Sequence, residues 1–357
     1  MIDILNLTFP ELERFIVEDL GQPKFRAAQV WQWIWQKHAT SFDAMTDVSK
    51  QLRAKLAEVA EIVLPEIVTV QTSSDGTEKL LLRLRDGALV ETVILPSTGQ
   101  DGSVRIAQCV SSQIGCAMGC TFCSTGTMGF IRNMTAGEIL SQVLVARMRL
   151  GDNRIDHPII RNLVFMGMGE PMGNYKSVLS AVRQISAMPP EGFGISARNI
   201  TVSTVGVVPG IKKLTAEGIP VRLAVSLHAP SDELRDELVP MNKRFNTTQV
   251  LDAAHDYYLA SKRRVRIEYA LMRGINDQAE HAKLLAKRLN HYGDNWAHVN
   301  PIPLNPIEGS KWTASKPEDE QQFLDILHKA GITATLRDTR GQDIDGACGQ
   351  LAAKEQD

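Results

Sequence analysis

The chain has 357 residues, of which 43% are hydrophobic and 22% are charged, and its formal net charge is −2. This composition is ordinary for a globular protein with room for one large domain and a smaller one. It excludes the strongly basic balance of a protein that coats nucleic acid. The sequence contains no apolar run of the length that a membrane-spanning helix needs, and its first residues do not resemble a secretory signal, so we expect a cytoplasmic location.

Residues 1–95 are predicted to form a small α+β accessory domain. Helical periodicity covers residues 9–20, 25–37 and 49–60. Alternating apolar positions predict strands at 66–72, 78–84 and 88–95. Asp75-Gly76 and Asp86-Gly87 separate these strands as tight turns. A polar, glycine-containing connector follows at 96–102.

Residues 96–345 alternate short apolar strands with longer amphipathic helices. The expected strands are 104–110, 162–166, 199–203, 221–227, 266–271 and 298–303, with 333–337 as a last one. The expected helices are 136–150, 175–187, 209–217, 248–259, 278–290 and 317–329. This alternation predicts an α/β fold with a parallel sheet, and six such units favour a partial (β/α)6 barrel over a closed eight-fold one. Residues 346–357 are left as a carboxyl-terminal segment that carries Cys348.

Polar motifs follow several of the predicted strands. They are Gly169-Glu170-Pro171, Ser203-Thr204, Ser226-Leu227-His228 and Asn305-Pro306. Parallel α/β folds place their chemistry at the carboxyl ends of the strands. We therefore expect these motifs to line one shared pocket.

Four of the five cysteines fall within fifteen residues: Cys109, Cys116, Cys120 and Cys123, with Cys348 near the end of the chain. The last three of the four form a C-x3-C-x2-C run directly after a predicted strand. Three thiolates can bind three irons of a [4Fe–4S] cluster and leave the fourth iron open to a ligand. The alternative is a four-cysteine zinc site that includes Cys109, but structural zinc usually uses two well-separated short pairs of ligands.

The C-x3-C-x2-C run, with an aromatic residue before its last cysteine, resembles the signature of the radical S-adenosylmethionine superfamily. Further segments resemble the RlmN-type adenine-C2 methyltransferases of ribosomal and transfer RNA. These segments are MGMGEP at 166–171, SLHA at 226–229, RGQDIDGACGQL at 340–351 and FRA at 25–27. The resemblance runs through nearly the whole chain.

That resemblance implies a role for each cysteine. Cys116, Cys120 and Cys123 match the ligands of a cluster that cleaves S-adenosylmethionine to a 5′-deoxyadenosyl radical. Cys348 matches the cysteine that accepts a methyl group from a first S-adenosylmethionine, and a second one supplies the radical that activates this methyl for addition to adenine. Cys109 matches the cysteine that resolves the protein–RNA intermediate by forming a disulfide with Cys348, a step that needs a reductant.

The resemblance also assigns residues around the cofactor and the base. Glu91 matches the proton acceptor at the adenine. The residues that match contacts to S-adenosylmethionine are Gly169, Glu170, Ser203, Ser226, Leu227, His228 and Asn305. The implied partners are 23S ribosomal RNA near the peptidyl transferase centre, some transfer RNAs (the adenosine 3′ of the anticodon) and an electron-donating reductant system. We expect a monomer with no membrane partner.

RNA recognition is expected to fall partly to residues 1–95, with exposed Lys and Arg binding phosphates. Two basic segments are candidates, Lys262-Arg263-Arg264 and Lys243-Arg244, and each is equally well explained as a solvated surface. Two other functions remain open at this point. One is methylation of adenine C8, as in the related resistance enzymes, and the other is a zinc-stabilised RNA-binding module that is not an enzyme.

Overall fold

The fold is described from a computed structural model. The described residues are 1–99, 102–152, 154, 158–293, 295–305, 307 and 309–352. Parts of three predicted features lie outside these ranges, namely residues 100–101 of the connector, Pro306 of the Asn305-Pro306 motif and residues 353–357 of the carboxyl-terminal segment.

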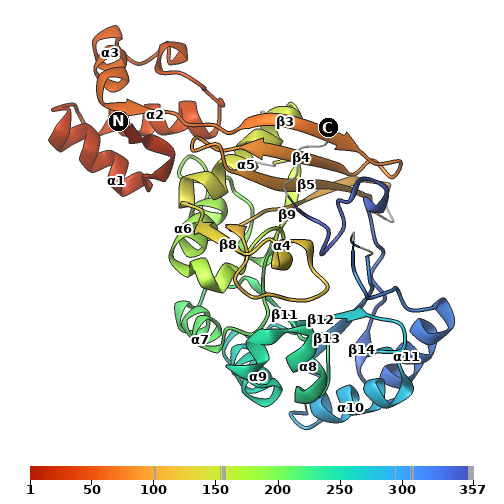
Figure 1. The fold of residues 1–357 in the computed structure, drawn as a ribbon. Coiled ribbons are helices and arrows are strands. Elements are labelled where there is room, and N and C mark those ends of the chain that lie inside the picture. The colour runs from red at the N-terminus through yellow and green to blue at the C-terminus, as the bar shows by residue number, and fades with distance from the viewer. Residues whose placement is uncertain are drawn as a thin grey trace.

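A curved ten-stranded sheet, in the order β14-β13-β12-β11-β10-β9-β6-β5-β4-β3, runs through the molecule (Figure 1). Its parallel strands are β6 (Val104–Cys109), β9 (Ile160–Phe165), β10 (Ile200–Thr204), β11 (Arg222–Ser226), β12 (Val265–Leu271), β13 (Ala297–Pro303) and the short β14 (Thr333–Ala334). Every one of these strands overlaps a predicted strand. The expected partial (β/α)6 barrel is confirmed.

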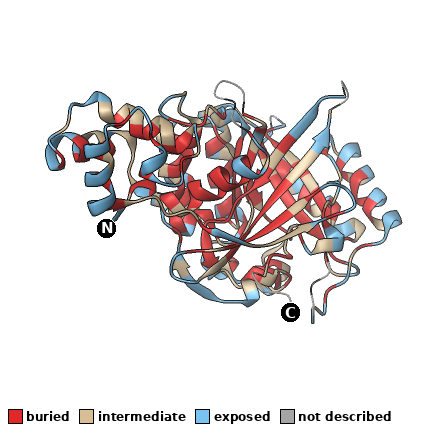
Figure 2. Cartoon of the chain, turned by 90° about the horizontal axis from the view of Figure 1, so that it is seen from above, coloured by how far each residue is buried: buried red, intermediate tan, exposed pale blue. Residues whose placement is uncertain are grey.

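Six helices connect these strands. They are α5 (Ala136–Arg149), α6 (Tyr175–Ser186), α7 (Val208–Glu217), α9 (Thr247–Ser261), α10 (Ala279–Asn290) and α11 (Pro317–Lys329). Two begin at capping boxes, in which Thr135 pairs with Glu138 and Asn246 pairs with Gln249. The helices cover the outer side of the sheet, so their inward faces are buried and their outer faces exposed (Figures 1 and 2). Within the described ranges, no helix has the length and apolarity to cross a membrane.

Three antiparallel strands extend the barrel sheet at its amino-terminal edge. They are β3 (Glu66–Thr72), β4 (Glu78–Arg83) and β5 (Leu89–Thr98). Strand β5 pairs with β6 from Val93↔Cys109 to Thr98↔Val104. The sequence predicted a small separate sheet followed by a connector. Instead these strands belong to the central sheet, and residues 96–98 of the predicted connector are part of β5.

The residues before β3 are mainly helical and pack beside the barrel at one end (Figure 1). The elements of this part are β1 (Ile2–Asp3), η1 (Ile4–Asn6), α1 (Phe9–Arg14), η2 (Phe15–Asp19), α2 (Phe25–Trp35), η3 (Phe42–Ala44), α3 (Lys50–Val59) and β2 (Ala60–Glu61). The ring centroids of Trp35 and Phe193 lie 5.5 Å apart, and the two rings pack edge to face. The Gly137 N–H of α5 donates to Asn6 Oδ1 at 2.9 Å. These contacts fix the helical part against the barrel.

Several short elements surround the cysteine run and escaped the sequence analysis. Strands β7 (Gln113–Gly115) and β8 (Phe130–Asn133) form a hairpin that encloses the run together with α4 (Ser124–Thr127). On the far side lie α8 (Asp232–Leu238) and η6 (Pro240–Lys243). The remaining single turns are η4 (Pro171–Asn174), η5 (Ala197–Asn199) and η7 (Gln342–Ile344). None exceeds seven residues, which is too short for periodicity to reveal.

Candidate active site

The loop that carries Cys116, Cys120 and Cys123, which we call the cluster loop, is closed at its base by two glycines. Gly115 has φ +70°, and a Cβ at this position would lie 1.9 Å from the Gly129 carbonyl oxygen. That same carbonyl accepts the Cys116 N–H at 2.8 Å. Only glycine at position 115 tolerates both the backbone conformation and the close approach. The two ends of the cluster loop can therefore lie in direct contact at the hairpin.

The three thiols of the cluster loop lie in surroundings that suit a bound metal cluster. Burial raises the pKa of Cys116 to about 12 and that of Cys120 well above its usual value, and it also raises the pKa of Cys123. The backbone N–H groups of Gly126 and Thr125 are aimed at the Cys123 sulfur. Buried thiolates need a compensating positive charge, and an iron–sulfur cluster supplies it while amide donors stabilise its sulfur ligands. The donor set therefore fits such a cluster.

The zinc alternative fits this geometry less well. Among the described residues, no three His, Cys, Asp or Glu side chains are grouped so as to hold a single metal ion. Cys109 does not join the other three cysteines but lines a different cavity, together with Cys348. A cluster distributes its thiolate ligands over several irons, so its ligands do not have to converge on one point.

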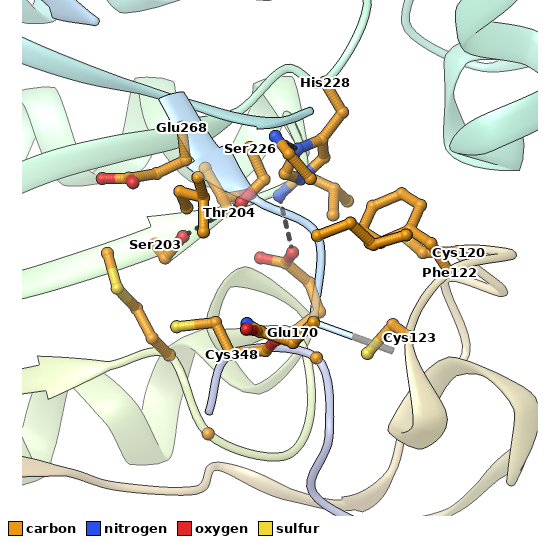
Figure 3. A pocket seen from close by; sticks show the side chains of 18 of the residues that line it. Cys120, Phe122, Cys123, Glu170, Ser203, Thr204, Ser226, His228, Glu268 and Cys348 are labelled. Atoms are coloured by element: carbon orange, nitrogen blue, oxygen red, sulfur yellow. Dashed lines mark hydrogen bonds between the residues drawn. The ribbon is translucent and has the colours of Figure 1, made fainter. Parts of the chain in front are cut away.

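A cavity beside the cluster loop gathers most of the predicted site. The predicted residues that line it are Cys120, Cys123, Gly169, Glu170, Ser203, Ser226, His228, Asn305 and Cys348. Figure 3 shows Cys123, Glu170, Ser203 and Cys348 facing the same space. Cys116, Leu227 and Glu91 do not line it. The expectation of one pocket at the carboxyl ends of the strands thus holds for these motifs.

Glu170 presents a buried carboxylate at the wall of this cavity. Its Oε1 accepts the Met172 N–H and its Oε2 accepts the Val205 N–H, both at 2.9 Å. Burial raises its pKa to about 7, against the opposing effect of these two hydrogen bonds. A buried carboxylate of this kind favours a cationic partner, because a neighbouring ammonium stabilises its ionised form.

Replacing Glu170 by glutamine is expected to weaken binding of S-adenosylmethionine about 10- to 100-fold. The family resemblance assigns Glu170 to the ammonium of this cofactor, and a charge-assisted hydrogen bond of that kind is worth roughly 1.5–3 kcal/mol. Equilibrium binding to cluster-loaded protein measures the effect, and Glu237→Gln, which changes an exposed carboxylate, is the control. Unchanged affinity of the Glu170→Gln variant for S-adenosylmethionine would contradict a contact between Glu170 and the ammonium of the cofactor.

The Ser226-Leu227-His228 motif contributes one hydroxyl and a structural histidine. Ser226 Oγ lies 3.3 Å from Ser203 Oγ at the cavity wall. Leu227 is fully buried outside the cavity, and its carbonyl accepts from Arg235. Burial lowers the pKa of His228 to about 3, its Nδ1 accepts the Ala270 N–H at 3.0 Å, and its ring packs on Phe122 at 4.7 Å. His228 therefore supports the cluster loop through its ring and lines the cavity, and its contact with S-adenosylmethionine stays a prediction.

A second cavity adjoins the first, and Cys348 lines both of them. Cys109 also lines this second cavity. Burial raises the pKa of Cys109 to about 12, and the nearby Cys348 thiol adds to this effect. Asn305 and Arg337 also line both cavities. All five cysteines are free thiols in this structure. Cys348 therefore stands where the space beside the cluster loop meets the space beside Cys109.

Three hydrogen bonds, from two parts of the chain, hold the carboxyl-terminal segment in this position. Asn305 Nδ2 donates to the Cys348 carbonyl at 2.9 Å, and the Ser124 N–H donates to the Gly349 carbonyl at 2.8 Å. The buried Thr125 hydroxyl donates to the Leu351 carbonyl at 2.7 Å. Because Ser124 and Thr125 directly follow Cys123, the cluster loop itself fixes the segment that carries Cys348.

Thr125→Val is expected to loosen the carboxyl-terminal segment without changing its shape. The lost buried hydrogen bond is worth about 0.5–1.5 kcal/mol, which makes local opening roughly two- to tenfold more frequent. Hydrogen exchange at residues 347–352 measures this opening. Thr127→Val is the matched control, because its hydroxyl bonds to the Ser124 carbonyl within α4. Equal exchange in both variants would show that Thr125 does not hold the segment.

Glu91 lies on β5 and lines neither cavity. Its carboxylate is buried, its Oε1 lies 3.3 Å from Lys79 Nζ, and its Oε2 accepts the Ala352 N–H at 2.8 Å. In this conformation Glu91 therefore anchors the carboxyl-terminal segment. Its role as a proton acceptor stays a prediction and requires that the Ala352 contact opens.

The sequence analysis missed two charged residues at the site. Glu268 is buried on β12 and lines the first cavity, and its Oε1 accepts from Asn300 Nδ2 at 2.9 Å. Its Oε2 lies 3.7 Å from Arg337 Nη1. The pKa of Arg337 is raised, chiefly by Cys348 and also by Glu268 and Cys109. The sequence did contain a signal for Glu268: it is a lone glutamate inside an apolar strand, and a buried carboxylate requires a buried polar partner.

Comparison with known proteins places this geometry in a family. Residues 2–62 match the ribosomal RNA large subunit methyltransferase N-terminal domain, and residues 110–286 match the radical SAM superfamily. A probable dual-specificity RNA methyltransferase RlmN from Bifidobacterium adolescentis is 68% identical, over 95% of this chain and 88% of that protein. The chain belongs to the RlmN family of radical SAM RNA methyltransferases.

Other members of the RlmN family agree with this assignment. The dual-specificity RNA methyltransferase RlmN of Nitratidesulfovibrio vulgaris is 53% identical, over 99% of this chain and 96% of that protein. The crystal structure of a radical SAM methyltransferase from Sphaerobacter thermophilus superposes with a TM-score of 0.91 at 42% identity, covering 99% of this chain and all of that one. Membership of the radical SAM superfamily implies S-adenosylmethionine and an iron–sulfur cluster as cofactors, and the non-enzymatic alternative is set aside.

Proposed function

We propose that this RlmN-family enzyme methylates C2 of adenine, with Cys348 as the carrier of the methyl group. The substrates are 23S ribosomal RNA near the peptidyl transferase centre and transfer RNA at the adenosine 3′ of the anticodon. The observation that carries the proposal is the place of Cys348, which lines both the cavity beside the cluster loop and the cavity beside Cys109.

Cys116, Cys120 and Cys123 hold a [4Fe–4S] cluster in this proposal. The cluster and two molecules of S-adenosylmethionine per turnover supply a methyl group and a hydrogen-abstracting radical. Glu170 binds the ammonium of the cofactor, and Ser203, Ser226 and Asn305 provide further polar contacts. A protein-borne carbon is needed because C2 of adenine has no nucleophilic character, so polar methyl transfer cannot reach it.

The two remaining cysteines carry and release the product. The Cys348 sulfur holds the methyl group and then links the protein to the base through that carbon. The radical adduct must lose one electron as well as one proton: the electron can return to the cluster, and Glu91 takes the proton from the base. The Cys109 thiolate then attacks the Cys348 sulfur. The sulfur–carbon bond breaks, a disulfide forms, and the methylated base leaves with a proton. A reductant returns both cysteines to thiols, and Arg337 offers the cation that a buried thiolate needs.

The predicted RNA-recognition region, residues 1–95, contributes chiefly through its helical part before β3 in this proposal, because its strands continue into the sheet of the barrel core at 96–345. The family match over 2–62 and the packing of these helices against α5 support that assignment. The terminal segment at 346–357 carries Cys348. The target base leaves its stack to reach the cavity, as base-modifying enzymes require. The protein acts as a cytoplasmic monomer with an electron-donating partner.

Nucleoside mass spectrometry of ribosomal and transfer RNA, from cells with and without the gene, tests this function. The proposal predicts 2-methyladenosine in both RNA classes only when the gene is present. Recovery of 8-methyladenosine without 2-methyladenosine would move the reaction to C8, the alternative regiochemistry.

A further inference from the structure

The cluster loop is flanked by an unusual set of exposed side chains. On one side, the hairpin β7–β8 exposes three large apolar residues: Met128 at 38%, Phe130 at 47% and Ile131 at 66%. On the other side, η6 and the residue after it expose Lys243 and Arg244. We call these five residues the loop rim.

The segments that carry the two halves of the loop rim contact the cluster loop. The Cys116 N–H donates to the carbonyl of Gly129, the residue between Met128 and Phe130. On the opposite side, the Thr121 N–H donates to the Leu238 carbonyl at 3.1 Å, and the Pro240 ring lies 3.9 Å from where a Gly119 Cβ would be. The same loop contributes Cys120, Phe122 and Cys123 to the lining of the first cavity. The rim therefore flanks the loop that forms part of the wall of the first cavity.

The stability of the fold does not require the side chains of the loop rim to be exposed. Large apolar side chains gathered on one exposed hairpin mark an interaction surface. The neighbouring Arg132 is already engaged, at 2.8 Å from both Asp86 and Glu138. Across the loop, the Glu237 carboxylate is matched by Lys311 at 3.0 Å. Asp236, on the same side of the loop, accepts from Asn242 Nδ2 at 2.7 Å. Among the described residues Lys243 and Arg244 form no ion pair, so their charge is available to a partner.

We propose that the loop rim is a docking surface for RNA on the two sides of the target base. Phe130 and Ile131 pack against unstacked bases, and Lys243 and Arg244 bind the adjoining phosphates. Aromatic and apolar platforms combined with cations are the pattern that single-stranded RNA requires. A rim beside the cavity would hold the nucleotides that flank an extruded adenine. This inference rests on the proposed function, because it takes the partner to be the substrate RNA.

The double variant Phe130→Ala/Ile131→Ala tests the apolar half. We expect the cluster-loaded enzyme to bind a substrate RNA hairpin at least about 25-fold more weakly, since each of the two stacked bases contributes about fivefold or more. Absorbance near 400 nm shows that the cluster is intact. Leu259→Ala is the control, because it truncates another exposed apolar side chain, on α9. RNA affinity equal to that of the wild type would overturn the proposal.

The double variant Lys243→Gln/Arg244→Gln tests the charged half. It is expected to reduce the slope of log affinity against log salt concentration by about 1.4, or about 0.7 for each lost phosphate contact. Lys283→Gln/Lys329→Gln removes the same charge from exposed positions on α10 and α11 and is expected to leave the slope unchanged. An unchanged slope in the rim variant would contradict the phosphate contacts.

A second readout separates RNA from a protein partner. If the rim variants bind RNA normally but lose turnover with a protein reductant while keeping it with dithionite, the rim is a docking site for the electron donor and the proposal falls. If the wild-type protein makes no 2-methyladenosine, the proposed function fails. Weakened RNA binding by the rim variants would in that case still support the surface itself.

Discussion

Replacing Cys348 by alanine is expected to abolish RNA methylation, with a loss of roughly 10³-fold or more in rate. Cys348 lines both cavities, and among the described residues no other cysteine does so. The methyl group therefore has no second carrier at this position. Formation of 2-methyladenosine by anaerobic, cluster-loaded protein measures the effect.

The Cys348→Ala variant should retain its cluster and its reductive cleavage of S-adenosylmethionine. The reason is that Cys116, Cys120 and Cys123 lie on a separate loop, and the hydrogen bonds between this loop and the terminal segment go to the backbone carbonyls of Gly349 and Leu351. Methylation at the wild-type rate would show that the methyl group does not pass through this sulfur. Loss of the cluster would instead make Cys348 a structural residue.

Replacing Cys109 by alanine is expected to trap the enzyme covalently on its RNA. The first steps need only Cys348 and the cofactors, whereas release needs a thiolate to attack the Cys348 sulfur. Cys109 is the cysteine that shares the second cavity with Cys348. A slowly migrating protein–RNA band that survives denaturation, with no multiple turnover, is the expected result.

The double variant Cys109→Ala/Cys348→Ala is the control for this adduct. It should form no covalent band, since the carrier sulfur is missing. An adduct in the double variant would place the linkage on a different residue. Normal turnover of Cys109→Ala would remove the disulfide step from the mechanism.

The alternation of strands and helices predicted the barrel because each unit is local. The predicted bounds of α5 and α11, for example, match the observed ones to within one residue. The pairing of β5 with β6 was not predicted, because it depends on contacts between strands and on a turn that the composition of the 96–102 connector did not reveal. Pro96 even lies inside the paired region, where proline is normally a signal against a strand.

In the site, too, features that depend on nearby residues could be predicted, whereas contacts between distant parts of the chain could not. The cysteine spacing, the motifs at strand ends and the family resemblance together identified the nine predicted site residues that line the first cavity. Glu91 was predicted as a proton acceptor, but its present partners, Lys79 and Ala352, come from another strand and from the far end of the chain. Thr125 escaped attention because a threonine beside a cysteine motif gives no signal until the terminal segment folds against it.

The isotope content of the product methyl group shows whether the methyl passes through the Cys348 sulfur and is activated there. When the enzyme turns over with S-adenosylmethionine that carries a fully deuterated methyl group, we expect 2-methyladenosine with two deuterium atoms in its new methyl. The reason is that one hydrogen must be abstracted from the methyl on Cys348 before the carbon can join adenine, and protium later takes its place. A product that retains all three deuterium atoms would mean that the methyl moves intact, and it would contradict the role of Cys348 as a carrier whose methyl is activated beside the cluster loop.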